Sequence, residues 1–264
     1  MITIFTPTYN RAYRLPNLYK SLQAQTCKDF EWLVVDDGST DNTSELFEKW
    51  QTEDNSFPIR YFKQPNGGKH RAINRGVKEA KGEYFFIVDS DDVLTNDAVE
   101  QITRLVPEAN ANPEICGMCF RCKNIKTNEI IGSPFPNDGM LASSLEWVYK
   151  YKIDGDKSEV VNTAILRRYP FPEFEGENFV PEALIWNRIA DSYRMICKNE
   201  GIYLCEYLPD GLSMGFNSNL RRNPNGFGLF YCETMKRGIS FKVTLKNLLR
   251  TVQCWLYKLS RVFS

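Results

Sequence analysis

The chain has 264 residues, of which 42% are hydrophobic and 25% are charged, and it contains 17 Phe, 13 Tyr and 5 Trp. This length suffices for one domain with its own core, and the composition excludes a disordered, collagen-like or simple coiled-coil protein. The 33 basic and 33 acidic residues cancel, so no net field favours nucleic acid, and we expect no nucleic-acid partner.

Short apolar runs bounded by turn residues alternate with helical patterns in the first part of the chain. They predict strands at 2–6, 32–36, 59–62 and 84–88, and helices at 15–25, 41–50 and 69–80. This alternation predicts a parallel sheet, and the uninterrupted apolar runs of the second and fourth strands predict helices on both of its faces.

The pattern is looser after Thr95, which is expected to cap a helix that ends near residue 105. Strands are predicted near 115–122, 160–166 and 202–207, with a helix after Pro181. We therefore divide the chain into residues 1–95, a ligand-binding half, residues 96–232, the second half of the same domain, and residues 233–264, a basic tail.

Two acidic clusters follow predicted strands, at the edge where parallel sheets bind ligands. One is Asp36-Asp37-Gly38-Ser39-Thr40-Asp41, and the other is Asp89-Ser90-Asp91-Asp92. Crowded carboxylates raise one another's pKa unless a cation or hydrogen-bond donors compensate, and their hard oxygens suit Mg²⁺ or Mn²⁺. For the first cluster, a turn followed by a helix cap is an open alternative.

Several motifs occur in order over roughly the first hundred residues: Thr6-Pro7-Thr8-Tyr9-Asn10-Arg11, Val34-Val35-Asp36-Asp37-Gly38-Ser39, Asn66-Gly67-Gly68-Lys69 and Asp89-Ser90-Asp91-Asp92. Together they resemble the inverting family-2 glycosyltransferases of the GT-A fold. The resemblance weakens after this region and ends near Ser213. It implies an α/β, Rossmann-like, mostly parallel sheet and transfer of a sugar from a nucleotide-sugar, with a UDP-sugar as the expected donor.

The same resemblance implies roles for individual residues. Asp37 is expected to read the uracil or ribose with Tyr9 beside the base, and Pro7, Lys69 and Ser90 are expected to join the nucleotide-sugar site. Asp89 is expected to meet the ribose or the metal. Asp91 and Asp92 are expected to bind a Mn²⁺ or Mg²⁺ ion that bridges to the diphosphate.

An inverting transfer also needs a carboxylate that accepts the proton of the acceptor hydroxyl. Counting back six residues from Arg188 places Glu182 at the position where the family carries this base, although Pro181 replaces the usual acidic neighbour. A plain charge at a helix N-terminus is the alternative interpretation of Glu182. Rival bases lie nearby in the sequence: Glu173, Glu175, Glu177 and Asp191.

Other side chains carry weaker signals. His70, the only histidine, and its neighbour Lys69 either contact the nucleotide phosphates or belong to a solvated helix start. Cys116, Cys119 and Cys122 have metal-ligand spacing without a fourth partner, so an apolar strand is favoured. All eight cysteines are expected to be reduced thiols.

Competing functions differ in what they require. A phosphatase with an aspartyl nucleophile is disfavoured, because Val35 stands at the nucleophile position. A nucleotidyltransferase of related fold and a non-catalytic carbohydrate-binding or scaffold protein remain as alternatives. The expected acceptor is a glycan on a lipid carrier, in a groove lined by Trp147, Trp186 and aromatic residues of 171–179.

After Glu233 the chain has seven basic residues and no acidic one. Apolar residues in this tail recur at helical spacing, at Phe241, Leu245, Leu248, Val252, Trp255, Leu259 and Val262, widened by Leu249, Leu256 and Phe263. Such a helix suits an anionic membrane surface. Docking on the catalytic core and pairing with a second subunit, as in a homodimer, are the alternatives.

The start of the chain and its hydropathy bear on location. Met1 leads directly into an apolar strand without the features of a signal peptide, and no apolar run approaches the ~20 residues of a membrane span. We therefore expect a cytoplasmic protein that is bound peripherally at the inner face of the cytoplasmic membrane.

Overall fold

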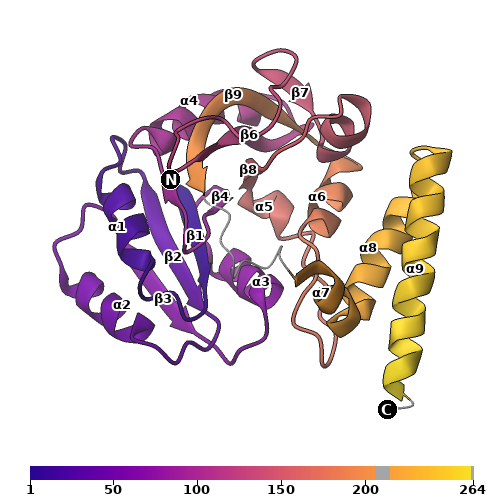
Figure 1. The fold of residues 1–264 in the computed structure, drawn as a ribbon. Coiled ribbons are helices and arrows are strands. Elements are labelled where there is room, and N and C mark those ends of the chain that lie inside the picture. Colours follow the sequence, from indigo (N-terminus) through magenta and orange to yellow (C-terminus); the bar gives the residue numbers. More distant parts are fainter. Residues whose placement is uncertain (206–214, 263–264) are drawn as a thin grey trace.

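The computed structural model describes residues 1–205 and 215–262, and strands and helices alternate in its first half (Figure 1). This half contains β1 (Ile2–Thr8), α1 (Leu15–Gln23), β2 (Phe30–Asp36), α2 (Thr43–Thr52), β3 (Ile59–Lys63), α3 (Lys69–Glu79) and β4 (Tyr84–Ile87). Every predicted element of this half is confirmed, with boundaries that differ by at most two residues.

The second half follows the sequence pattern less closely. It contains β5 (Val93–Leu94), α4 (Ala98–Ala111), β6 (Ile115–Asn124), β7 (Met140–Ala142), a π-helical turn η1 (Glu146–Lys150), β8 (Lys157–Asn162), α5 (Thr163–Leu166), α6 (Ala183–Ala190) and β9 (Arg194–Cys205). Helices α7 (Phe216–Arg222), α8 (Pro224–Lys236) and α9 (Phe241–Val262) complete it.

Three predictions for this half need correction. The strand expected at 160–166 ends at Asn162, because the Asn162 side chain accepts the backbone N–H groups of Ala164 and Ile165 and so starts α5. The helix expected to end near residue 105 continues to Ala111. The strand expected at 202–207 already begins at Arg194, and residues 206 and 207 lie outside the described part.

The strands form one sheet in the order β3-β2-β1-β4-β8-β6-β9-β5, with β7 paired to β9. As predicted, β1 is parallel to both β2 and β4, and β2 is parallel to β3. One face packs on α1, α2 and α4, and the other packs on α3 and α6. Helices therefore cover both faces, as expected, and the carboxyl ends of β1, β2 and β4 meet at one edge of the sheet.

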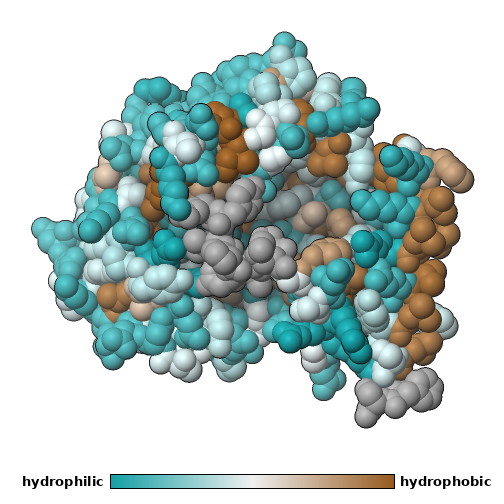
Figure 2. All heavy atoms as spheres, in the orientation of Figure 1, coloured by the Kyte–Doolittle hydropathy of each residue, from teal (hydrophilic) through white to brown (hydrophobic). Residues whose placement is uncertain are grey.

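Helix α9 lies beside α8 at the margin of the molecule (Figure 1). The predicted amphipathic helix is confirmed, but the side that packs on the protein is not the predicted apolar stripe: it carries Asn247, which is 7% exposed, and Cys254, which is 1% exposed. The apolar stripe faces outward along the edge of the molecule (Figure 2). Its exposed members are Phe241, Leu245, Leu248, Leu249, Val252, Trp255 and Leu256.

Helix α9 therefore packs on the protein without burying its stripe, which we call the α9 apolar face. The side chains of Val262 and Phe263, which the sequence placed on the same stripe, lie outside the described residues. Among the described helices, none is both long and apolar enough to cross a membrane.

Candidate active site

The acidic loop after β2 is held by hydrogen bonds within the protein. The Asp37 carboxylate is buried and accepts the backbone N–H groups of Gly67 and Gly68, the latter at 2.6 Å, and the side-chain amide of Gln64 at 2.8 Å. Asp36 accepts the backbone N–H of Ser39. These carboxylates are compensated by neutral donors, so the loop has a fixed shape without an added cation.

The same loop is joined to the segment that follows β1. Asn10, in a left-handed conformation (φ 52°), donates its backbone N–H to Ser39 Oγ and accepts the Thr40 N–H. The Asp41 carboxylate accepts the backbone N–H of Ala12 and of Thr43 at the start of α2, although the N-cap residue of this helix is Asn42 rather than Asp41.

Pro7 and Tyr9, which were predicted to lie near the nucleobase, belong to β1 and to this segment. Pro7 is buried within β1, whereas Tyr9 follows the strand and is 49% exposed. Tyr9 thus stands at the surface directly beside the loop that Asn10 ties to β2.

The acidic loop after β4 has the opposite character. Burial, and secondarily the neighbouring Asp89, raises the pKa of Asp91, and the same two causes raise the pKa of Asp92 to about 8. Tyr203 donates its hydroxyl to Asp92 at 2.6 Å and accepts the backbone N–H of Asp89. Ser90, which follows Asp89 in the chain, is also buried. This loop concentrates carboxylates that hydrogen bonds compensate only in part.

Lys69 connects this loop with Glu182, the predicted general base. Its ammonium lies 2.7 Å from an oxygen of Asp89 and 2.8 Å from an oxygen of Glu182. Burial alone would lower the pKa of Lys69, but the two carboxylates raise it overall. Lys69 therefore links Asp89 and Glu182, two residues that the sequence placed in the same site but that lie far apart in the chain.

The contact depends on a close approach of two backbones. At Gly68 (φ 97°), a Cβ atom would lie 1.8 Å from the carbonyl oxygen of Asn178, so only glycine fits at this position. Asn178 and Phe179 donate their N–H groups to the side chain of Asn223, at the start of α8. The segment that leads to Glu182 is thus held between α3 and α8.

Three of the four rival carboxylates are engaged elsewhere, and the fourth, Glu175, is exposed and lies outside the lining of the cavity beside Asp89. Glu173 pairs with Arg71 and accepts the Asn74 amide. Glu177 is buried and accepts the backbone N–H groups of Asn225 and Gly226, and Asp191 pairs with Arg237. Of the candidate bases that the sequence offered, Glu182 alone lines the cavity beside Asp89.

This cavity, which we call the inner cavity, measures about 80 Å³. Its lining consists of Lys69, Ile87, Asp89, Lys157, Ser158, Glu159, Glu182, Trp186 and Tyr203. Sequence reasoning missed Glu159 and Tyr203. Glu159 could have been noticed in the sequence, because this charged residue directly precedes Val160 and Val161 of a predicted buried strand.

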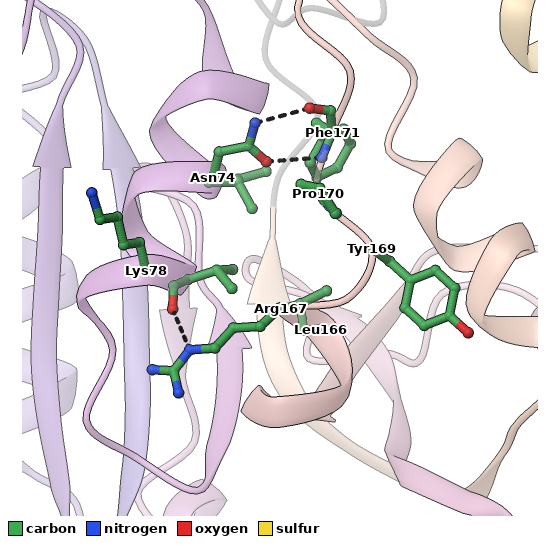
Figure 3. Close-up of a pocket in the computed structure, with 9 residues that line it drawn as sticks. Asn74, Lys78, Leu166, Arg167, Tyr169, Pro170 and Phe171 are labelled. Carbon is green, nitrogen blue, oxygen red and sulfur yellow. Dashed lines mark hydrogen bonds between the residues drawn. The ribbon is translucent and has the colours of Figure 1, made fainter.

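A larger cavity of about 300 Å³ lies elsewhere, between α3 and the segment after α5 (Figure 3). Asn74 exchanges two hydrogen bonds with the backbone of Phe171, and Arg167 donates to the carbonyl oxygens of Val77 and Ala80. These polar groups join α3 to the second half of the chain, so the cavity marks a structural junction.

Several secondary expectations can now be settled. His70 is 2% exposed rather than solvated, and burial lowers its pKa to about 4. Cys116, Cys119 and Cys122 lie on the buried strand β6, as predicted. Trp147 is buried in the core, whereas Phe171 lines the larger cavity and Trp186 lines the inner cavity.

Comparison with known proteins identifies the family. The sequence profile described as Glycosyl transferase family 2 matches residues 3–166, which is more than half of the chain. The chain belongs to glycosyl transferase family 2. This membership confirms the resemblance seen in the motifs and disfavours the nucleotidyltransferase alternative.

A GalNAc(5)-diNAcBac-PP-undecaprenol beta-1,3-glucosyltransferase of Campylobacter jejuni is 29% identical over 229 residues, which cover 84% of this chain and 70% of that protein. Three other glycosyltransferase relatives are 37–38% identical over 109–113 residues, but the chain spans only 18–37% of their length.

Two solved structures share the fold. One is S. aureus TarS 1-349 in complex with UDP-GlcNAc, with a TM-score of 0.65 at 19% identity over 96% of this chain and 79% of that one. The other is the mannosyltransferase PcManGT from Pyrobaculum calidifontis in complex with GDP-Man and Mn²⁺, with a TM-score of 0.64 at 17% identity over 100% of this chain and 75% of that one. The predicted GT-A fold is thereby confirmed.

Proposed function

We propose that this protein transfers a sugar from a nucleotide-sugar, with a UDP-sugar as donor, to an acceptor hydroxyl with inversion at the anomeric carbon. The observation that carries the proposal is the Lys69 bridge, since it brings Glu182 beside the acidic loop. Family membership, together with the nucleotide-sugars bound by the two structural neighbours, supports this class of donor.

The donor nucleotide is proposed to lie at the carboxyl ends of β1, β2 and β4. Pro7 and the exposed Tyr9 ring border the base, and Asp37 shapes this part of the site through the Gly67–Gly68 turn that it holds. Asp89, Ser90 and Lys69 face the ribose and diphosphate, where the Lys69 ammonium contributes positive charge.

The acidic loop suits a divalent metal. Among residues 1–205 and 215–262, no group of three or more His, Cys, Asp or Glu side chains forms a ready metal site. Mg²⁺, however, typically takes one or two protein carboxylates together with substrate phosphates. Asp91 and Asp92 supply hard oxygens, and their raised pKa values reflect negative charge that hydrogen bonds do not balance.

We therefore propose Asp91 and Asp92 as the residues that hold Mn²⁺ or Mg²⁺. When bound there, the cation would stabilise the charge that develops on the leaving nucleoside diphosphate. The Mn²⁺ in the mannosyltransferase neighbour supports this choice of metal.

Glu182 is proposed as the general base. It stands at the N-terminus of α6, 34% of its side chain is exposed, and Lys69 fixes one of its oxygens at 2.8 Å. A carboxylate held at the cavity mouth can accept the proton of an entering hydroxyl while that oxygen attacks the anomeric carbon from the face opposite the diphosphate. A single displacement of this kind inverts the configuration.

For the acceptor, we propose a lipid-linked glycan in surface polysaccharide assembly. The Campylobacter relative, whose name specifies an undecaprenol-diphosphate acceptor, supports this class. The α9 apolar face supports it independently, because seven exposed large apolar residues on one helix suit the interface of a membrane.

The side chains around this face agree with a peripheral location on an anionic membrane. Lys242, Lys246 and Lys258 are exposed on α9, and each basic residue near an anionic surface contributes about 1 kcal/mol. Arg250 instead lies over the Phe216 ring, and Arg261 pairs with Glu177, so these two arginines help to dock the helix.

Vesicle co-sedimentation tests the membrane proposal. Removing α9 would uncover the cluster that Cys254 forms with Phe227 and Tyr231, so substitutions on the outer face are the better variants. The triple variant Leu245→Ser, Leu249→Ser and Trp255→Ser is expected to lose binding to anionic vesicles, whereas Leu141→Ser, at an exposed leucine on β7, is expected to retain it. Equal sedimentation of both variants would contradict the proposal.

UDP release tests the catalytic proposal. Wild-type protein is expected to release UDP from its preferred UDP-sugar in the presence of Mn²⁺ and an acceptor, and Glu182→Gln is expected to reduce kcat about 100-fold or more while donor affinity changes little. Retained turnover in Glu182→Gln would exclude Glu182 as the base. No release by wild type with any donor would favour a non-catalytic protein.

A further inference from the structure

The inner cavity contains a second carboxylate, Glu159, to which neither the motifs nor the mechanism above gives a role. Glu159 lies on β8 between β4 and β6, and its neighbour Val160 pairs with Phe86 of β4. Its side chain lines the inner cavity together with Glu182 and Asp89. It therefore lies on the sheet at the floor of the site, whereas Glu182 stands on α6.

No residue of 1–205 or 215–262 forms an ion pair with the Glu159 carboxylate or donates a side-chain hydrogen bond to it. The nearby cations are engaged elsewhere: Lys69 contacts Asp89 and Glu182, and Lys157 donates to the carbonyl oxygens of Asp154 and Gly155. Burial, and secondarily the Glu182 charge, raises the pKa of Glu159 to about 8. The part of the protein that the structure describes therefore gives the carboxylate no partner that would account for its presence in the cavity.

The surroundings of Glu159 are those of a site for hydroxyl groups. Ser158, Trp186 and Tyr203 are among the residues that line the same cavity. Its volume of about 80 Å³ is well below the ~300–1,000 Å³ of pockets that enclose a whole small molecule. The cavity can thus enclose one polar edge of a ligand, while the rest of the ligand lies outside it.

We infer that Glu159 binds a hydroxyl group of the transferred sugar and contributes to the choice of donor. The inference rests on the proposed function, because it requires a nucleotide-sugar at the Asp89 loop. The transferred sugar is bonded to the diphosphate, so it must lie next to that loop, and β4, the strand beside Glu159, leads directly into it. For the acceptor hydroxyl, the proposed partner is Glu182.

Binding measurements without an acceptor isolate this interaction. We compare the Kd of UDP alone with the Kd of the preferred UDP-sugar, chosen from UDP-glucose, UDP-galactose, UDP-GlcNAc and UDP-GalNAc, in the presence of Mn²⁺. Glu159→Leu removes the polar atoms at similar volume. It is expected to leave the Kd of UDP within about twofold and to weaken UDP-sugar binding roughly tenfold, and Glu159→Gln is expected to lie between it and wild type.

Controls separate binding from folding. Glu129→Gln, at an exposed glutamate outside the cavity, is expected to leave both Kd values unchanged. The Tm of Glu159→Leu is expected to equal or exceed that of wild type, because the substitution breaks no ion pair or side-chain hydrogen bond among the described residues.

Equal weakening of UDP and UDP-sugar would overturn the inference and make Glu159 a structural residue. Unchanged donor binding with a raised KM for the acceptor would overturn it in favour of an acceptor contact. Failure of wild type to bind any of these nucleotides would instead show that the proposed function itself is wrong, and the inference would fall with it.

Discussion

The two acidic loops at the ligand edge of the sheet contain similar residues in different surroundings. In the loop after β2, the Asp37 carboxylate is surrounded by donors, namely two backbone N–H groups and a side-chain amide. In the loop after β4, Asp91 and Asp92 have raised pKa values because burial and Asp89 act on them together.

The two loops thus differ in how many donors surround their carboxylates, and this difference separates the proposed scaffold from the proposed cation site. In the first loop the Asp37 carboxylate finds all its donors within the protein, so this loop can hold the proposed nucleobase-binding surface in place. The second loop retains unbalanced negative charge, which a divalent cation and a diphosphate can use. Substitutions that remove one charge from each loop should therefore have different effects.

The largest effect is expected from Asp91→Asn. Loss of one proposed metal ligand should reduce Mn²⁺-dependent transfer by about 100-fold or more, measured as UDP release. In the absence of metal, the Tm should equal or exceed that of wild type, because one of the crowded charges has been removed. Near-normal turnover at saturating Mn²⁺ would show that Asp91 is not a ligand.

Asp37→Asn, in contrast to Asp91→Asn, should mainly reduce the stability of the fold. The new amide group presents a donor to the N–H groups of Gly67 and Gly68, which leaves buried polar groups unpaired, so we expect a loss of about 3 kcal/mol in the free energy of unfolding. Urea titration measures this loss. A variant as stable as wild type would mean that the loop needs no carboxylate at this position.

The smallest effect concerns His70, which follows the turn that Asp37 holds. Its pKa is lowered to about 4 in the folded protein, from an ordinary value of 6.5. The unfolded chain therefore binds a proton first as the pH falls, so this stabilising contribution is complete above pH 6.5 and is lost progressively as the pH falls towards 4.

Wild type should consequently lose roughly 2 kcal/mol more unfolding free energy than His70→Gln between pH 7 and pH 5. Urea titrations at both pH values provide the comparison, and the absence of any other histidine in the chain simplifies it. Parallel pH dependence in the two proteins would contradict the assignment.

The sequence alone predicted the elements of the first half, the parallel sheet and the edge at which the motifs gather. These features depend on local patterns: uninterrupted apolar strands, turn residues and helical spacing over short stretches of chain. It also predicted the amphipathic character of α9, because a repeat of apolar residues needs no knowledge of neighbouring elements.

Tertiary structure alone decided which carboxylates share a site. Glu173, Glu177 and Glu182 lie within ten residues of one another, yet only Glu182 meets Lys69, because Gly68 allows the α3 start to approach the backbone at Asn178. Glu159 joined the cavity through the pairing of β8 with β4, strands that are far apart in sequence. The outward direction of the α9 apolar face was likewise decided by packing, since α9 turns the opposite side, with Asn247 and Cys254, towards the protein. Contacts between distant segments depend on the whole fold, and a local pattern holds no information about them.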